Sequence, residues 1–107
     1  MRRIFLAMAL VAATAAGGAA VAQTIGDPAA GRRLAEAWCS ECHAITVYAL
    51  GEPRRGPEFA EVANRAKTTA LSLNVFLRSN HDNMPNFILT RDEADDIVAY
   101  ILSLKGG

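Results

Sequence analysis

The sequence Cys39-Ser40-Glu41-Cys42-His43 places two thiols three positions apart and an imidazole directly after them. Two thiols at this spacing, near the end of a helix, can form thioether bonds with the two vinyl groups of one haem. The adjacent imidazole of His43 can then coordinate the iron as its proximal ligand. The motif therefore predicts one covalently attached haem c, bound by Cys39 and Cys42 with His43 on the iron.

The sequence supports three other interpretations of these residues less well. A redox dithiol of the thioredoxin type begins a helix after a strand, whereas this pair follows a predicted helix and no strand pattern precedes it. A structural zinc site needs four ligands. His81 could join Cys39, Cys42 and His43, but joint ligation by the adjacent Cys42 and His43 is sterically awkward. A plain disulfide leaves His43 without a role, so haem attachment is the interpretation that uses all three residues.

Met84 is the residue that we expect as the second ligand of the iron. Haem iron in such a domain is capped by a methionine, by a histidine or by no protein group. Met84 lies 41 residues after His43, and Pro85 directly after it keeps the segment out of a helix. A lone methionine is ordinarily core filling, but a loop flanked by asparagine and proline suits that role poorly. His81 and an open coordination position are the alternatives.

The composition narrows the class of protein. The chain has 107 residues, 51% of them hydrophobic, and 11 basic side chains against 11 acidic ones. This apolar fraction argues against a disordered chain, and the balanced charge argues against a nucleic-acid-binding protein. Two cysteines are too few for a scaffold of several disulfides. We therefore expect a single small globular domain without a nucleic-acid partner.

Residues 1–22 have the layout of a secretory signal peptide. Arg2 and Arg3 give a positive start, an apolar stretch follows, and Ala20-Val21-Ala22 is a small-x-small cleavage pattern. A retained anchor helix is the alternative, but the stretch is barely long enough to span a bilayer. We expect cleavage after residue 22 and export to the periplasm.

The expected mature domain is 23–107. Removal of 22 of the 107 residues leaves 85, and loss of the two leader arginines leaves nine basic against eleven acidic side chains, a charge of −2. No membrane-spanning segment is expected in this part. Chains of this size bury only about 60–65% of their unfolded surface, and small scaffolds usually recruit a cofactor, a metal or a disulfide set.

Helical patterns run through the mature chain, and no strand alternation is present. Asp27 followed by proline predicts the start of one helix, and Thr90 with Glu93 forms a capping-box pattern at the start of the last. The sequence predicts an all-α domain of three to five short helices. Their expected ranges are 28–38, 58–66, 69–78 and a final helix that follows Thr90 and stops near 105–107.

Taken together, these features resemble the class I cytochromes c, small monohaem proteins. The resemblance covers about residues 26–104, and its parts occur in family order: Gly31, the Cys-x-x-Cys-His motif, Gly56-Pro57, Met84 and Tyr100. It implies a small fold wrapped around one haem. It also implies that the Pro57 carbonyl accepts a hydrogen bond from the His43 ring, and that Tyr100 packs near Gly31.

Further residues are candidates for contacts with the haem. Tyr48, Arg54 and Arg55 are candidates for bonding the haem propionates. Ala35 stands where many members carry a large aromatic residue, and the ring of docking lysines found in mitochondrial members is absent. The expected apolar wall of the haem pocket consists of Phe59, Leu73, Phe76, Leu77, Phe87 and Ile88.

The expected function is one-electron transfer in the periplasm rather than catalysis, because a fully ligated iron leaves no substrate site. The expected partners are other redox proteins, with a periplasmic dehydrogenase as donor and an oxidase or another cytochrome as acceptor. A monomer is expected, or else a haem subunit bound tightly to such a dehydrogenase. A sensor that binds ligands at a vacant iron is the alternative from a different class.

Overall fold

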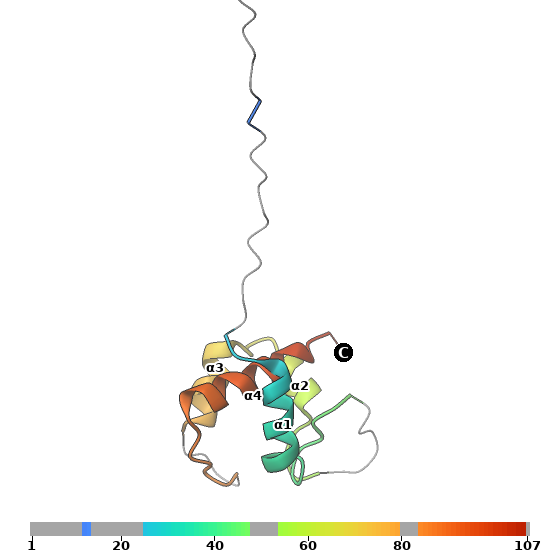
Figure 1. Ribbon diagram of the computed structural model, residues 1–107. Coiled ribbons are helices and arrows are strands. Elements are labelled where there is room, and N and C mark those ends of the chain that lie inside the picture. Colours follow the sequence, from blue (N-terminus) through green and yellow to red (C-terminus); the bar gives the residue numbers. More distant parts are fainter. Residues whose placement is uncertain (1–11, 14–24, 48–53, 80–83, 107) are drawn as a thin grey trace, which may run out of the picture.

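The computed structural model describes residues 12–13, 25–47, 54–79 and 84–106 of the chain. Within these ranges the structure is helical, with α1 (Pro28–Trp38), α2 (Phe59–Asn64), α3 (Ala70–Leu77) and α4 (Arg91–Ser103), and no strand is present (Figure 1). The predicted all-α class is therefore confirmed. Apart from residues 12–13, the predicted signal peptide lies outside the described residues.

The helices begin where side chains can bind the free backbone N–H groups of the first turn. Asp27 caps α1 through its side chain, and Thr90 and Glu93 form the predicted capping box of α4. Thr69 and Ser72 form a second capping box at α3. Each box satisfies two backbone donors that would otherwise lack a partner. Among the described residues, no helix is long and apolar enough to cross a membrane.

α1 and α4 cross at Gly31, and this crossing is the centre of the fold (Figure 1). A Cβ atom built on Gly31 would lie 1.8 Å from the Asp96 carbonyl oxygen and 2.9 Å from the Tyr100 Cβ atom. Only glycine permits this approach, and the expected packing of Tyr100 near Gly31 is confirmed. Ala35, one turn along α1, is completely buried, so the small side chain fits the tight crossing.

α4 is the helix against which the other three pack. Its Ile97 and Val98 are the largest fully buried side chains of the described core. The Tyr100 hydroxyl donates a hydrogen bond of 2.5 Å to the Ile45 carbonyl, which ties the segment after the Cys-x-x-Cys-His motif to α4. The described core cluster comprises Ala35, Cys39, Ile45, Phe59, Ala63, Leu73, Ile97, Val98, Tyr100 and Ile101.

Candidate functional site

The Cys-x-x-Cys-His motif forms a tight turn at the end of α1. Cys39 is the C-cap of α1, and its carbonyl accepts hydrogen bonds from the backbone N–H groups of Cys42 (3.1 Å) and His43 (2.9 Å). The Cys42 carbonyl in turn accepts from the Gly56 N–H at 2.7 Å. Backbone bonds thus fix both cysteines and the histidine relative to one another and to the Gly56-Pro57 segment.

The His43 ring is oriented by the backbone carbonyl of Pro57. Its Nδ1 lies 2.7 Å from that oxygen. A carbonyl can only accept a hydrogen bond, so Nδ1 must carry the proton, and in a neutral imidazole Nε2 then holds the free lone pair. The ring also lies against Phe59, with ring centroids 5.2 Å apart. His43 is therefore held in the tautomer that can ligate a metal through Nε2.

Gly56 allows the chain to pass directly over the His43 ring. A Cβ atom at this position would lie 2.3 Å from His43 Cε1 and 2.6 Å from Nδ1. Just beyond Pro57, the Phe59 N–H donates a hydrogen bond of 3.0 Å to the Ala44 carbonyl, which holds the same segment against the motif. The absence of a side chain at Gly56 is thus what lets the Pro57 carbonyl reach the imidazole.

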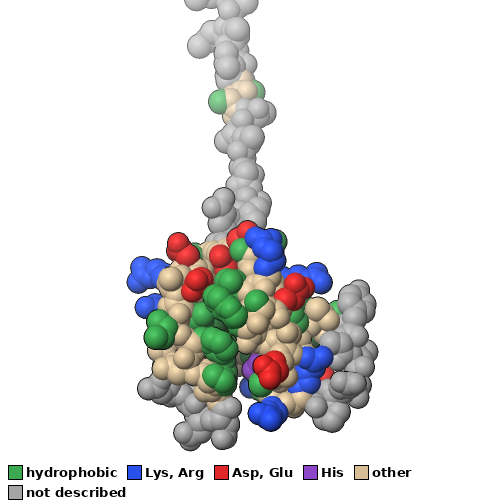
Figure 2. All heavy atoms as spheres, turned by 60° about the horizontal axis from the view of Figure 1, so that its bottom comes forward, with side chains coloured by type: hydrophobic (Ala, Val, Ile, Leu, Met, Phe, Trp, Pro, Cys, Tyr) green, Lys and Arg blue, Asp and Glu red, His purple; other side chains and the backbone are tan. Residues whose placement is uncertain are grey.

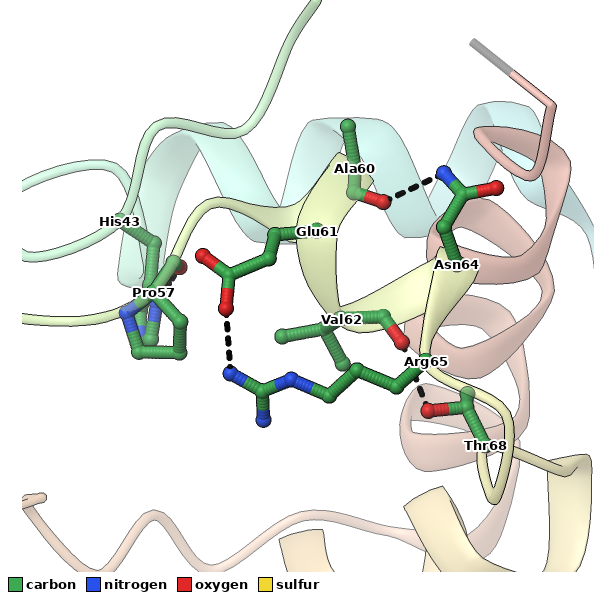
Figure 3. A network of polar contacts seen from close by, with 8 residues as sticks. All are labelled: His43, Pro57, Ala60, Glu61, Val62, Asn64, Arg65 and Thr68. Atoms are coloured by element: carbon green, nitrogen blue, oxygen red, sulfur yellow. Dashed lines mark hydrogen bonds and ion pairs between the residues drawn. The ribbon is translucent and has the colours of Figure 1, made fainter.

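A polar network lies along α2 beside this pair (Figure 3). Arg65 and Glu61 form an ion pair of 2.8 Å, in which both side chains are more than half exposed. The Thr68 hydroxyl donates to the Val62 carbonyl at 2.6 Å, which closes the turn after α2. An exposed pair of this kind contributes little to stability, so Arg65 is free to exchange Glu61 for another anion.

A cavity of about 390 Å³ opens beside the motif, within the range of about 300–1,000 Å³ that is common for small-molecule sites. Figure 2 shows hydrophobic side chains gathered in a band over one face, with the purple of a histidine side chain at its edge. The lining comprises Cys39, Cys42, His43, Arg55, Gly56, Pro57, Phe59, Val62, Arg65, Thr68, Ser72, Leu73, Phe76, Leu77, Met84, Pro85 and Ile101.

Most of the residues singled out in the sequence lie on this one cavity. The two cysteines, His43, Pro57 and Met84 line it, as do Phe59, Leu73, Phe76 and Leu77 from the expected wall. Arg55 lines it too, whereas the Arg54 guanidinium donates to the Ser40 carbonyl. Tyr48 and His81 lie outside the described residues.

The structure places two expected wall residues elsewhere. Ile88 is 97% exposed, and Phe87 stacks on Trp38 outside the large cavity. The segment that follows Met84 has no regular structure, so hydrophobicity alone does not determine which side chain turns inward. Pro85 lines the cavity in their place.

Five cavity residues, on α2, α3, α4 and the turn between α2 and α3, are not among the site residues predicted from the sequence. Arg65, Thr68 and Ser72 add polar groups to the lining, and Val62 and Ile101 add apolar ones. Ile101 was recognisable as part of the apolar face of the last helix. The other four offered no signal, because their approach to the cavity depends on how α2 and α3 pack on α4.

The chemistry of the donor set fits a covalently bound haem. The Cys39 side chain is buried, and this burial raises the pKa of its thiol to about 11. Neither cysteine is in a disulfide, and within the described ranges no three His, Cys, Asp or Glu side chains form a metal site. Two thiols, one oriented imidazole and one thioether around an apolar cavity match the needs of haem c.

Comparisons with known proteins point the same way. The family model described as "Cytochrome C oxidase, cbb3-type, subunit III" matches residues 26–101. Cytochrome c-552 of Bradyrhizobium diazoefficiens is 40% identical over 79 residues, which are 74% of this chain and 76% of that protein. No solved structure gives a significant match. The range matched by the family model contains both cysteines, His43 and Met84.

Proposed function

The chain belongs to this family of monohaem c-type cytochromes, which bind haem c covalently, and we propose that it is a periplasmic electron carrier with His43 and Met84 as its iron ligands. The observation that supports this ligation is that both side chains line one cavity together with the two cysteines. The proton on His43 Nδ1 leaves Nε2 available. The lining would thus offer a bound haem one nitrogen donor from His43 and one sulfur donor from Met84.

The bound haem supplies a one-electron Fe(II)/Fe(III) couple, and the surrounding residues set its potential. Neutral sulfur from Met84 and an apolar wall that includes Phe59 and Leu73 disfavour the additional positive charge of Fe(III). The hydrogen bond from His43 to the Pro57 carbonyl makes the imidazole a stronger electron-pair donor to a metal. Arg55 and Arg65 are the cations in the lining, and we assign them to the carboxylates of the haem.

The same arrangement favours electron transfer over catalysis. With His43 and Met84 both on the iron, no coordination position is left for a substrate. The partners are then redox proteins that meet the surface beside the cofactor in a small, transient contact. The predicted leader, with its positive start and small-residue cleavage pattern, supports export, and a dehydrogenase as donor with an oxidase or another cytochrome as acceptor fits that compartment.

A second candidate is a haem subunit held permanently by a dehydrogenase, and one surface of α3 favours it. Leu71 is 75% exposed and Val75, one turn further along α3, is 58% exposed, and neither lines the cavity. Exposed apolar side chains gathered on one helix are a common mark of an interface. Gel filtration of a native extract separates the two candidates, because a free carrier elutes as a small protein and a subunit elutes with a large enzyme.

Spectroscopy of the purified holoprotein tests the ligation. The ferric protein should show the weak charge-transfer band of a thioether bound to iron, and the ferrous protein should not bind carbon monoxide rapidly at neutral pH. Met84→Ala should lose the band, gain rapid carbon monoxide binding and have a lower potential. His81→Ala is the matched control and should keep all three wild-type properties. Rapid carbon monoxide binding by the wild type would reject the ligation and favour the sensor with a vacant iron.

A further inference from the structure

Trp38 and Phe87 form an aromatic stack that joins the two sides of the cofactor site. Their ring centroids are 6.3 Å apart and the ring planes differ by 17°. Trp38 is the last residue of α1 and precedes Cys39, while Phe87 lies three residues after Met84. The stack therefore connects the helix end that carries the cysteines to the segment that carries the methionine.

The surroundings of the stack show that it is packed rather than incidental. Trp38 and Phe87 line a narrow cavity together with Cys39 and Met84. Its volume is about 20 Å³, which is room for about one water molecule. Trp38 and Phe87 are each 37% exposed, so most of both rings is in contact with protein. Met84 borders this narrow cavity as well as the large one.

The segment that follows Met84 depends on such contacts because its backbone has no regular structure. Residues 85–89 belong to no helix or strand, and Pro85 has no N–H to donate. Ile88 is 97% exposed and contributes no anchor, while Leu89 packs against the core from the edge of α4. Phe87 on Trp38 is thus the aromatic anchor between Met84 and the start of α4.

We propose that the Trp38–Phe87 stack is a clasp that holds Met84 in place as an iron ligand. The proposal rests on Met84 ligation, and it makes Trp38 and Phe87 positioning residues that do not touch the iron. Dissociation of the thioether requires the segment to swing away, which breaks the stack. Aromatic pairs contribute enough beyond burial for loss of one to raise the open population several-fold to about tenfold.

Imidazole affinity of the ferric holoprotein measures this open population. Imidazole can bind the iron only when Met84 has left, so its apparent affinity is proportional to the open fraction. Trp38→Ala and Phe87→Ala should each lower the apparent Kd for imidazole by several-fold to about tenfold. Trp38→Phe should keep a value near that of the wild type because a ring remains. Ile88→Ala, in the same segment but fully exposed, is the control and should leave the Kd unchanged.

The double variant Trp38→Ala/Phe87→Ala separates a clasp from two independent packing effects. A clasp predicts that the double variant binds imidazole about as tightly as either single variant, because the second change removes nothing more. Additive effects, or single variants with the wild-type Kd, would overturn the clasp while Met84 ligation stands. Absence of the thioether charge-transfer band from the wild type would overturn both proposals. If Trp38→Ala yields no holoprotein, Phe87→Ala and Phe87→Leu carry the same comparison.

Discussion

Gly31→Ala tests whether the α1–α4 crossing controls the stability of the domain. The added methyl group would lie 1.8 Å from the Asp96 carbonyl oxygen and 2.4 Å from its carbonyl carbon. Both atoms belong to the backbone of α4, so no side chain can rotate away to make room. The helices must therefore separate by more than about 1 Å to restore an ordinary contact distance, the same order as the gaps that cost packed atoms much of their attraction.

Two effects of opposite sign determine how much Gly31→Ala changes the free energy of unfolding. Alanine has the better helix propensity and should stabilise α1 by about 1 kcal/mol. Overpacking at a rigid contact costs about 1–3 kcal/mol, and a gap of 0.5–1 Å forfeits about a quarter to a half of each dispersion contact. The gap would extend to the fully buried Ala35, Ile97 and Val98. We expect a net loss of about 2 kcal/mol, the upper end of the overpacking cost less the gain in helix propensity.

Thermal unfolding of the ferric holoprotein, followed by far-ultraviolet circular dichroism, measures this loss. A decrease of about 2 kcal/mol corresponds to a fall in Tm of about 8–16 °C for a domain of this size. Ala37→Gly, on the exposed face of the same helix, is the control for propensity and should lower the free energy of unfolding by about 1 kcal/mol. A Gly31→Ala protein with a Tm equal to or above that of the wild type would refute the crossing as the constraint.

Two other predictions concern the segments that frame the cavity. Gly56→Ala should push the His43 ring off the Pro57 carbonyl, because the new Cβ atom would lie 2.3 Å from the ring. The free energy of unfolding of the holoprotein should fall by about 1–3 kcal/mol, and its haem absorption spectrum should change. An unchanged spectrum would count against the contact between Gly56 and the ring. Burial raises the pKa of Tyr100 above its ordinary value of 10, and its hydroxyl donates to the Ile45 carbonyl. The stability of the wild type relative to Tyr100→Phe should therefore be constant below pH 10 and decrease as the pH rises through the folded-state pKa, which urea unfolding at pH 8 to 11 measures; a constant difference would contradict it.

The parts of the fold that the sequence predicts are those fixed by neighbours in the chain. Asp27 and Thr90 cap helices through bonds to residues two or three positions away, and such patterns are visible in a single sequence. The predicted ends of α1 agree with the observed helix, and α2 and α3 differ from their expected ranges by one or two residues at each end. The first part of the Cys-x-x-Cys-His turn is equally local, since the Cys39 backbone bonds to Ala35, Cys42 and His43.

The remaining site residues depend on packing between distant segments. Arg65 and Ser72 reach the cavity because α2 and α3 pack on α4, and no periodic pattern in a short helix indicates that placement. Phe87 and Ile88 are adjacent and both hydrophobic, yet Ile88 faces solvent and Phe87 lies on Trp38. The choice between them is made by the position of the α1 end, which is 49 residues earlier in the chain.

The two proposed iron ligands are held with very different firmness, and this asymmetry determines which one leaves first. His43 is fixed by its backbone bond to Cys39, by its ring bond to the Pro57 carbonyl and by contact with Phe59. Met84 sits on a segment without regular structure, where irregular backbone opens at lower free energy than packed helices. Competing ligands should therefore replace the methionine before the histidine. Heat and denaturant should likewise release the methionine first. If Met84 ligates the iron as proposed, the potential should fall as this segment opens and the thioether leaves.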